Sequence, residues 1–550
     1  MAPGAAEASF AVGDRVAGLD GARATVRFAG AVAGTEGEWL GVEWDDAARG
    51  KHGGEHEGVR YFEVDGAREG AEHCASFVRA RKLQPPRTFS QALRDKYASE
   101  EELDADVTGG PAMSVQTTSG ATIGVELVGE GALRSEQGQL ACLSRVFLEG
   151  APVSGPGPTG EAGALAPALE EIDVSGALLC NWSAAAALVA EFPKLQALHL
   201  NRARLGSAVG DADALAPFAK LSVLSLNACA LCWADAVALG RAIPALKELH
   251  LSANGIKALE SDGGGAADAS DAFRCLTLLN LDDNALADWA QLAAVVGGAP
   301  ALERLQLSAN AIAAVSYPGA GSADGEFSAL KTLILGGNKL DAWESVDALA
   351  RFPALEELRL SGNPLFGGSG SAVSTLNARL GVIARMASLR HLNGSEVRPT
   401  ERRDAELRYL RELPATSGKA PEEIAAENDR YRVLLAWHGP QMAASGDGSG
   451  AGGAGGSLGE SMLHVTIDCV AARAAKAGGA EPKQKKLPGS MTVGKLRLLC
   501  ERLTRVPAAR QRLFVRERGA PLPDPLDDDS LEIALAGVRE GATIIVDEEE

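Results

Sequence analysis

Two short pairs of metal-binding residues are the first places in this sequence at which chemistry is conceivable. Cys229 and Cys232 have the spacing of a zinc or dithiol redox motif, and His52 lies four residues before His56. A structural zinc ion takes four ligands, and the sequence contains no second cysteine pair at the matching spacing. The histidine pair is likewise too small a ligand set. We therefore predict structural roles for both pairs.

Catalytic motifs of the common hydrolases and nucleotide-binding enzymes are missing from the chain. It has no G-x-x-x-x-G-K-[ST] loop and no H-E-x-x-H motif. We therefore expect a protein that is not an enzyme, that needs no cofactor and that holds no metal ion.

The composition limits the class of partner and the compartment. The 550 residues are 46% hydrophobic, which suffices for several folded cores, and the formal net charge of −20 argues against nucleic acid or an anionic membrane as the main partner. The eight cysteines form no paired framework, and no secretory segment follows Met1. No apolar run reaches the roughly 20 residues that span a bilayer. We expect a cytoplasmic protein.

Lys51 is the strongest candidate for binding, because a lysine ammonium in a glycine-rich turn can meet carboxylates. Such a charge-assisted bond is worth roughly 1.5–3 kcal/mol. From residue 10 to 84, short apolar or aromatic strands alternate with glycine turns, which predicts a small all-β barrel. A barrel that exposes glycine backbone and aromatic edges suits an extended peptide. The simpler alternative for Lys51 is a solvated turn lysine.

This barrel segment resembles the CAP-Gly family in motif order and spacing. The matching stretches are 39–45, 50–54 and 58–62. The resemblance implies a groove that captures acidic C-terminal tails ending in Glu-Glu-Tyr or Glu-Glu-Phe, as on α-tubulin and end-binding proteins. The family's usual Gly-Lys-Asn-Asp-Gly loop is altered, with His52 for Asn and Gly53 for Asp. We expect Trp44 and Tyr61 to fill the core. By resemblance, the α-tubulin tail is assigned to Phe28, Trp39, Gly50, Lys51, His52, Gly53, Gly54, Phe77 and Arg79.

A leucine repeat fills the middle of the chain. Apolar residues recur at offsets 0, 3, 5 and 10, with asparagine or cysteine at offset 8. The alternating leucines predict a short strand with an apolar inner face, and the asparagine amide can satisfy backbone groups in the turn that follows. Clear copies begin at Leu246, Leu276, Leu302, Leu330 and Leu355, and looser ones at Leu143, Leu169, Leu195 and Leu221. The period, mostly about 25 to 30 residues, predicts an α/β leucine-rich repeat solenoid over residues 140–395.

The strands of such a solenoid line its concave face, which binds proteins by default, although a solvated face is the alternative for any single residue. Residues expected on that face are His199, Lys247, His250, Asp282, Arg304, Gln306, Glu357 and Arg359. Residues 85–139 are expected to form a linker and an N-terminal cap, with a helix at 89–97 and a cap strand at 123–128. Residues 396–440 are expected to be C-terminal cap helices that shield the last core layer.

The C-terminal part of the chain consists of two segments that differ in composition. Residues 441–460 are rich in Gly, Ser and Ala, which predicts a flexible tether. Residues 461–550 show a β-β-α-β-β order that resembles ubiquitin, an α+β fold called the β-grasp. The final Asp547–Glu550 contains no Gly-Gly, so we expect an integral docking domain and not a conjugated modifier. Leu513 and Phe514 are candidates for a surface patch, with core packing the alternative for one of them.

The succession of CAP-Gly barrel, leucine-rich solenoid and ubiquitin-like domain resembles the cofactor E family of tubulin-folding chaperones over almost the whole chain. The resemblance implies binding of α-tubulin through its acidic tail and its body. It also implies assembly and dissociation of αβ-tubulin heterodimers together with tubulin-folding cofactors B, C and D, in the cytoplasm and at the cytoskeleton. Two alternatives stay open: a microtubule-associated CAP-Gly adaptor, and a shuttle that carries tubulin to the proteasome through the ubiquitin-like domain.

Overall fold

The computed structural model describes most of the chain and divides it into two compact units. The first unit holds residues 1–364 and 388–396, and the second holds 365–387 and 397–550. The described residues are 10–64, 71–97, 114–116, 122–124, 140–208, 212–259, 271–317, 326–366, 372–445, 462–469, 482–489, 491–504, 506–516, 524–526, 529, 533 and 536–548. None of the helices in these ranges combines the length and the apolar character that crossing a bilayer requires.

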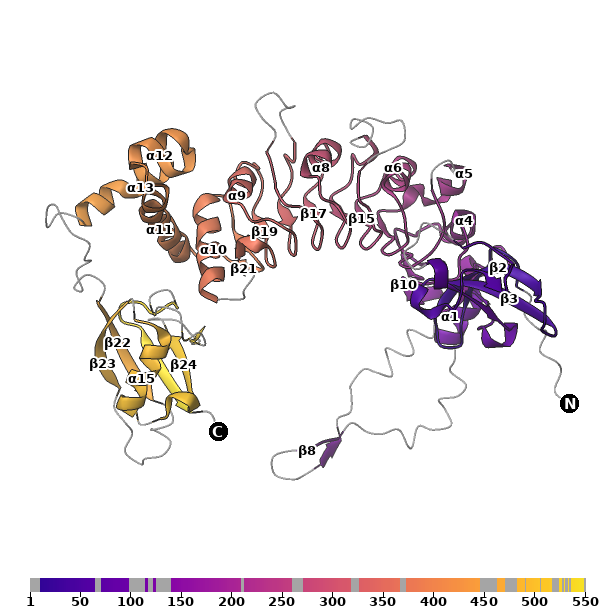
Figure 1. Ribbon diagram of the computed structural model, residues 1–550, viewed down its shortest axis with the longest axis horizontal. Coiled ribbons are helices and arrows are strands. Elements are labelled where there is room, and N and C mark those ends of the chain that lie inside the picture. The colour runs from indigo at the N-terminus through magenta and orange to yellow at the C-terminus, as the bar shows by residue number, and fades with distance from the viewer. Residues whose placement is uncertain are drawn as a thin grey trace. The chain divides into compact units, whose positions relative to one another are not determined.

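The first unit begins with a four-stranded antiparallel sheet in the order β1-β2-β3-β6. Its strands β2 and β3 are labelled in Figure 1. Leu40, Val42 and Trp44 occupy alternate positions of strand β3, and the period of two turns their side chains to one face. They meet Val16 and Val26 in the barrel's core, which places Trp44 where we expected it. The barrel's elements are β1 (Arg15–Ala17), β2 (Arg23–Ala31), β3 (Glu38–Trp44), η1 (Ala47–Arg49), β4 (Glu55–His56), β5 (Val59–Arg60), η2 (Ala71–His73), β6 (Ala75–Val78) and η3 (Ala80–Lys82).

A short parallel pair ties the chain after the barrel to the start of the solenoid. The elements of this region are β7 (Arg87–Thr88), α1 (Phe89–Tyr97), β8 (Ser114–Gln116), β9 (Thr122–Gly124) and β11 (Val153–Gly155). Strand β7 pairs with β11, and helix α1 follows it with Phe89 and Leu93 fully buried. Strand β9 pairs with β8 in a separate two-stranded sheet. The described residues of the expected cap strand, 123 and 124, are therefore not part of the solenoid sheet, and residues 125–128 lie outside the described residues.

Eleven strands of the described chain form the solenoid sheet, with β10 to β20 parallel and β21 antiparallel at the end. The central residue of each three-residue strand is the leucine or equivalent at offset 3 of the repeat, and Leu224, Leu249 and Leu279 are fully buried there. The strands are β10 (Arg145–Phe147), β12 (Glu171–Asp173), β13 (Ala197–His199), β14 (Val223–Ser225), β15 (Glu248–His250), β16 (Leu278–Asn280), β17 (Arg304–Gln306), β18 (Thr332–Ile334), β19 (Glu357–Arg359), β20 (His391–Leu392) and β21 (Ser395–Glu396).

The repeat asparagines form a hydrogen-bond ladder beside this sheet. Asn310 is 8% exposed, and its Nδ2 donates to the carbonyl oxygens of Leu281 (2.9 Å) and Leu307 (3.1 Å). Its Oδ1 accepts a bond from the backbone nitrogen of Leu286 (3.0 Å). The same bonding to two leucine carbonyls recurs at Asn254, Asn284, Asn338 and Asn363. These amides satisfy backbone groups that would otherwise be buried without partners, as the repeat pattern predicted.

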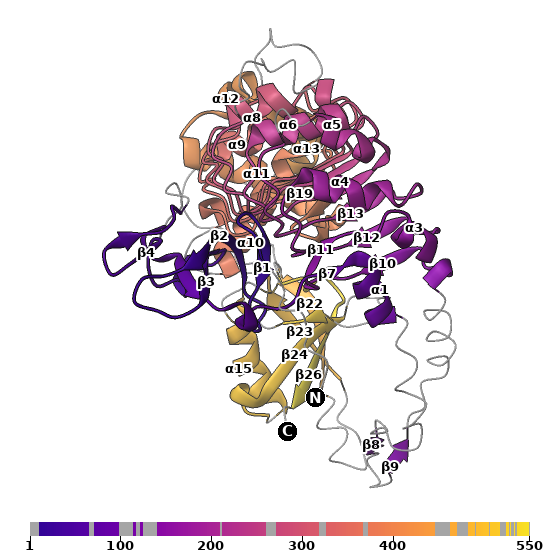
Figure 2. The ribbon, with the colours of Figure 1, turned by 90° about the vertical axis from the view of Figure 1, so that its right-hand side faces the viewer.

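Helices cover the side of the sheet opposite the strands' exposed face, as Figures 1 and 2 show. Several of them begin with a tryptophan that packs on a phenylalanine of the next repeat. The ring centroids lie 6.0 Å apart in Trp182–Phe218 and 5.5 Å apart in Trp233–Phe273. The helical segments are η4 (Leu140–Cys142), α3 (Glu161–Leu165), α4 (Trp182–Ala190), α5 (Ala212–Leu215), η5 (Ala216–Lys220), α6 (Trp233–Ala242), α8 (Trp289–Val296), α9 (Trp343–Leu349) and η6 (Pro364–Phe366).

The second unit opens with helices that surround a buried carboxylate. Glu406, 5% exposed, accepts a bond from Arg430 (2.6 Å), whose charge compensates the buried carboxylate of helix α11, and its second oxygen lies 2.9 Å from Nε2 of His438; both partners belong to helix α13. Helix α13 continues into the first residues of the expected tether. The helices are α10 (Ala372–Arg385), α11 (Pro399–Ser417), α12 (Pro421–Glu427) and α13 (Asp429–Ser445).

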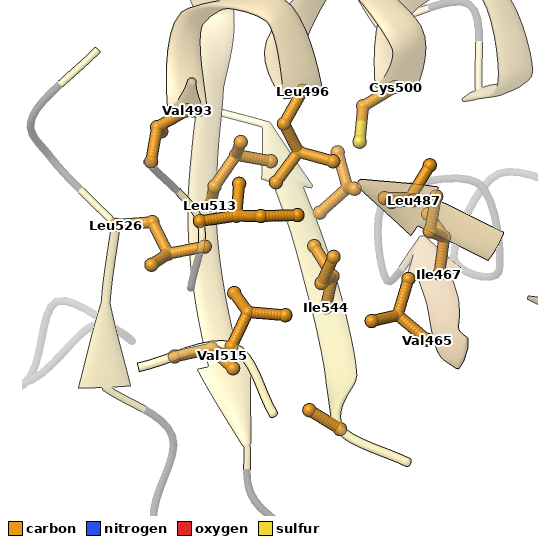
Figure 3. Close-up of a cluster of buried hydrophobic side chains, with 14 of the residues drawn as sticks. Val465, Ile467, Leu487, Val493, Leu496, Cys500, Leu513, Val515, Leu526 and Ile544 are labelled. Carbon is orange, nitrogen blue, oxygen red and sulfur yellow. The ribbon is translucent and has the colours of Figure 1, made fainter. Parts of the chain in front are cut away.

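The C-terminal domain of this unit is a β-grasp fold with one helix on a mixed five-stranded sheet of order β23-β22-β26-β24-β25. Figure 3 shows Val493, Leu496 and Cys500 of helix α15 pointing toward the sheet. Leu513 is 1% exposed in this core, whereas Phe514 faces away from it and pairs across strands with Ile545. The elements are β22 (Met462–Cys469), β23 (Lys483–Pro488), α15 (Val493–Thr504), η7 (Ala508–Arg510), β24 (Gln511–Arg516), β25 (Asp524–Pro525) and β26 (Thr543–Glu548).

Candidate peptide-binding groove and concave face

An aromatic cluster covers the face of the barrel sheet opposite its core. We call Phe28, Tyr61, Phe62 and Phe77 the aromatic face. Gly41 of β3 pairs with Phe28 on one side and Phe77 on the other, so both rings leave the sheet on the same face. The centroid of Phe77 lies 6.1 Å from Phe28, 5.5 Å from Tyr61 and 5.6 Å from Phe62. These edge-to-face contacts create an apolar surface that a peptide could contact.

Glycine at position 41 makes room for this cluster. A β-carbon on Gly41 would lie 2.7 Å from Cδ1 of Phe62 and 3.0 Å from the β-carbon of Phe28, so any side chain would displace Phe62. Phe62 is 7% exposed and thus already packed tightly on the sheet. The aromatic face therefore depends on a bare backbone at the centre of strand β3.

The glycines of the predicted loop also serve close packing. A β-carbon on Gly50 would lie 2.5 Å from the backbone nitrogen of Ala75, and Gly54 has a left-handed φ of +101° with its Cα against the carbonyl of Phe62. Gly53 is half-buried between them. Gly50 thus lets the loop lie directly on the start of strand β6, and Gly54 lets it approach the backbone of Phe62.

His52 lies in the aromatic cluster, and Lys51 precedes it with an exposed side chain. The ring of His52 is 5.0 Å from Phe77, and its Nδ1 accepts a bond from the backbone nitrogen of Gly54 (3.1 Å). Burial lowers the pKa of His52, and the charge of His56 lowers it further. The backbone nitrogen of Lys51 donates to Ala75 (2.7 Å). This bond fixes the base of a side chain whose ammonium extends into solvent.

Trp39 and Arg79, two further residues assigned to the tail, form a stacked pair. The guanidinium carbon of Arg79 lies 3.9 Å above the Trp39 ring. Arg79 also donates to the carbonyl of Glu38 (2.7 Å) and to that of Glu36. The guanidinium of Arg79 therefore holds the loop before β3 through these two bonds, and it also lines the groove beside it. The adjoining groove has a volume of about 860 Å³ and is lined by Phe10, Ala29, Gly30, Glu36, Gly37, Glu38, Trp39, Leu40, Arg79, Ala80 and Arg81.

Tyr61 is not a core residue, contrary to our expectation, and Phe62 was not foreseen at all. Tyr61 is half-buried, its ring centroid lies 5.3 Å from Phe28, and its hydroxyl accepts a bond from Ala33 (2.8 Å). The two residues that follow β5 place their rings over the sheet, where Phe62 packs on Gly41 and Tyr61 packs against Phe28 and Phe77. The two adjacent aromatic residues after a glycine turn were the sequence signal for this cluster. The sequence could not show on which face of the sheet they lie, because that depends on how the chain after β5 crosses the sheet.

The two candidate metal pairs have structural surroundings. The ring of His56 lies 6.1 Å from Phe77, so it belongs to the aromatic cluster with His52. Cys229 is 4% exposed and its thiol donates to the carbonyl of Leu200 (3.2 Å). Burial raises the pKa of Cys229 to about 12, far from the thiolate that metal binding or redox exchange needs. Cys232 caps helix α6 and donates its backbone N–H to Asp235 (2.9 Å). Among the residues that the structure describes, no group of three or more His, Cys, Asp or Glu side chains could hold a metal ion.

The residues expected on the concave face lie along the exposed face of the solenoid strands. His199, His250, Gln306 and Arg359 end strands β13, β15, β17 and β19, Arg304 and Glu357 begin β17 and β19, Lys247 precedes β15, and Asp282 follows β16. Burial lowers the pKa of His250 and raises that of Asp282, the carboxyl group of the next repeat. The middle of this face thus favours neutral forms of both residues.

One hydrogen-bonded series on this face resembles the order of a serine hydrolase triad. His199 Nδ1 lies 2.9 Å from the Ser225 hydroxyl, and His199 Nε2 lies 3.3 Å from the Glu171 carboxylate. Ser225 is only 4% exposed, so a substrate carbonyl has no approach to its hydroxyl. These bonds link three successive strands and act as a polar ladder.

Comparison with known proteins places the whole chain among relatives of one kind. The CAP-Gly domain profile matches residues 12–83. Over 550 residues the chain is 33% identical to the tubulin-folding cofactor E of Arabidopsis thaliana, covering 98% of each chain. It is 31% identical over 551 residues to the tubulin-specific chaperone E of Danio rerio, again covering 98% of each.

A solved structure also resembles the C-terminal domain. It is the ubiquitin-like domain of mouse tubulin-specific chaperone e, which is 26% identical and covers 18% of this chain and 96% of that one, with a TM-score of 0.16. The sequence similarity to the two relatives extends through the barrel, the solenoid and the C-terminal domain. The chain belongs to the tubulin-folding cofactor E family, also called tubulin-specific chaperone E.

Proposed function

We propose that this protein is a chaperone of α-tubulin that holds the acidic C-terminal tail in the barrel groove and the folded body on the concave face. The observation that carries the proposal is the aromatic face beside the exposed Lys51, in a chain of the cofactor E family. An extended peptide can lie on these rings while its carboxylates meet the lysine ammonium.

The charge distribution supports selective capture of an acidic tail. The chain carries a formal net charge of −20, so a local cation is needed to attract an anionic peptide against the overall repulsion. Lys51 and Arg79 supply two positive charges near the aromatic face, but Arg79 already donates hydrogen bonds to the carbonyl oxygens of Glu36 and Glu38. We therefore assign the main carboxylate contact to Lys51. Phe28, Trp39, His52, Phe77 and the three loop glycines shape the surface around it.

The remaining parts take supporting roles in this proposal. The segments 10–84, 140–395, 396–440 and 461–550 act as tail receptor, body receptor, cap and docking domain, joined through residues 85–139 and 441–460. Tubulin-folding cofactors B, C and D are the proposed partners in assembly and dissociation of αβ-tubulin heterodimers. The place of action is the cytoplasm, next to the cytoskeleton. The outward Phe514 and Ile545 offer the docking domain an apolar patch.

The decisive experiment is size-exclusion chromatography of the purified chain with αβ-tubulin, intact and with the α-tubulin tail removed. We expect a complex that contains α-tubulin without β-tubulin and that weakens when the tail is removed. A complex with the intact dimer or with polymer, without separation of the subunits, would instead indicate a microtubule-associated adaptor. Proteasome association that survives deletion of the barrel would indicate the shuttle.

Lys51→Ala tests the groove itself. Loss of one charge-assisted bond should weaken binding of an isolated α-tubulin tail peptide about tenfold, while the concave face still retains the tubulin body. Lys82→Ala is the matched control, because Lys82 is an exposed lysine of the same barrel outside the aromatic face. Calorimetric titration of the peptide measures both. Equal affinity of the Lys51→Ala variant and the unmodified chain would remove Lys51 from the proposal.

A further inference from the structure

The barrel is docked on the first repeats of the solenoid within the first unit. Arg23, at the start of strand β2, donates from Nε to the carbonyl of Gly176, in the turn after strand β12. Asp45, the residue after β3, accepts two bonds from Arg15 (2.8 and 2.5 Å) and lies 4.0 Å from Arg204 of the solenoid. These contacts join the barrel to two successive turns of the solenoid.

The turns of the solenoid share one backbone feature at the position where Arg23 docks. The residue just before the asparagine position has a left-handed φ in each of nine described repeats. These residues are Gly150, Gly176, Arg202, Ala228, Ala253, Asp283, Ala309, Gly337 and Gly362, with φ between 53° and 80°. Five of them carry a side chain. The left-handed backbone of this turn therefore does not by itself require glycine.

Gly176 has a different reason to lack a side chain. A β-carbon there would lie 3.0 Å from Nε of Arg23 and closer to the other guanidinium atoms. At Gly150, one repeat earlier, the nearest atom to such a carbon would be a terminal nitrogen of the same arginine, at 3.9 Å. The two glycines form a notch that the barrel's arginine occupies. Burial lowers the pKa of Arg23, and the charge of Arg202 lowers it further, as expected for a guanidinium held between protein surfaces.

The chain between the two parts is short. The backbone nitrogen and the side-chain amide of Gln84 bond to the barrel at Ala17 (2.8 Å) and Gly18 (3.0 Å), whereas the backbone nitrogen of Arg87 bonds to the solenoid at Pro152 (2.9 Å). Only Pro85 and Pro86 lie between these anchors. Two prolines form a stiff connection, so a small number of contacts suffices to fix the remaining rotation.

We propose that Arg23 and Gly176 are positioning residues that lock the barrel onto the solenoid, so that the groove and the concave face meet one partner in a fixed relative orientation. This inference rests on the proposed function for the identity of that partner, α-tubulin. A receptor whose two binding surfaces are already oriented loses less freedom when the second contact forms than one with a mobile barrel. Arg23 therefore affects binding of the tubulin body indirectly, by orienting the two binding surfaces, and does not contact the tail.

Three variants test the lock. Arg23→Ala removes the guanidinium, Gly176→Ala expels it from the notch, and Gly337→Ala is the matched control. Gly337 occupies the same turn position with φ +66° against +70° at Gly176, but the nearest atom to an added β-carbon there is a backbone nitrogen at 3.5 Å. In both glycine variants, alanine must adopt a left-handed φ, so the backbone strain is the same. The two variants differ because only the alanine at position 176 collides with the guanidinium of Arg23.

The first readout is the distance between one spin label on the barrel and one on the solenoid. Val59→Cys and Lys257→Cys provide exposed sites in a chain whose exposed native cysteines are replaced by serine. We expect one narrow distance distribution for the unmodified background and for Gly337→Ala, and a broad one for Arg23→Ala and Gly176→Ala. A distribution for Arg23→Ala as narrow as the background would overturn the lock. Arg23→Ala decides the question if Gly176→Ala fails to fold.

The second readout separates the lock from the proposed function. Affinity for the tail peptide should be unchanged in all three variants, because the aromatic face is intact. Affinity for α-tubulin should fall about threefold to tenfold in Arg23→Ala and Gly176→Ala only. A barrel that loosens in Arg23→Ala with no change in tubulin affinity would overturn the positioning role. If the unmodified chain binds no tubulin, the proposed function fails, and the label distances still decide whether the lock exists.

Discussion

The aromatic face of the barrel and the concave face of the solenoid differ in how far the stability of the fold depends on the residues that form them. In the barrel, Gly41 and Phe62 shape the aromatic face, and their contact also packs the residues after β5 onto the sheet. In the solenoid, buried leucines and the asparagine ladder stabilise the fold, whereas side chains such as that of Arg304 are exposed and take no part in the core. Substitutions in the groove should therefore change stability and binding together. On the concave face the two effects should separate.

The largest effect should come from the asparagine ladder. Asn310→Ala removes two bonds to leucine carbonyls and one from a backbone N–H, and it leaves those buried groups without partners. We expect a loss of about 3 kcal/mol in the free energy of unfolding of the first unit. Urea denaturation followed by circular dichroism measures it. Gln306→Ala, on the concave face of the same repeat, is the control, and an equal loss in both would contradict the comparison.

Next in size is a change at the centre of the aromatic face. In Gly41→Ala the new methyl group displaces Phe62, and overpacking of this kind costs about 2 kcal/mol. Binding of the tail peptide should fall in the same variant, because the aromatic face loses its arrangement. Thermal unfolding and peptide titration measure the two effects. Gly155→Ala is the control, since no atom lies within 4 Å of a β-carbon there. A stable Gly41→Ala that still lost the peptide would show that fold and groove are separable.

A smaller effect concerns pH and His52. Burial, and then His56, lower the pKa of His52 in the folded barrel, so the unfolded chain, with a histidine pKa of about 6.5, binds the proton more readily. The stabilising contribution is fully present above about pH 6.5 and is lost as the pH falls below that value. His52→Asn should reduce this loss of stability.

Amide exchange at Ala75 provides the measurement for His52, because this N–H donates to the carbonyl of His52 (2.9 Å). After correction for intrinsic exchange, its protection should fall between pH 7.5 and 5.5 more steeply in the unmodified chain than in His52→Asn. Parallel pH dependence in the two proteins would mean that His52 does not couple barrel stability to pH.

The smallest change in stability is expected on the concave face. Arg304 is exposed, so Arg304→Ala should alter the free energy of unfolding by no more than about 0.5 kcal/mol. Under the proposed function it should weaken binding of tubulin about threefold and leave the tail peptide unaffected. Urea denaturation and parallel titrations with tubulin and peptide measure this separation. A destabilisation as large as that of Gly41→Ala would end the distinction between the two faces.

The asparagine ladder shows how much a local pattern can predict. Each asparagine reaches only the neighbouring turns, so a repeat of leucines and one amide suffices to infer strand, turn and hydrogen bonds. The same reasoning explains why Cys229 at an asparagine position proved to be structural, with its thiol bonded to Leu200. Residues 123 and 124 of the expected cap strand pair with β8, because a short apolar run does not specify the strand with which it pairs, and residues 125–128 lie outside the described residues.

By itself, then, the sequence determined the succession of barrel, solenoid and β-grasp domain, because each rests on hydrophobic periods and turn residues within a few tens of positions. The tertiary structure decided which side chains share a surface. Phe62 lies on the aromatic face because it packs on Gly41, and Tyr61 lies there because it packs against Phe28 and Phe77. Arg23 reaches Gly176 because the barrel packs on the first repeats. Contacts between residues that are far apart in the sequence produce no periodic pattern in it. They follow from the packing of complete elements against one another.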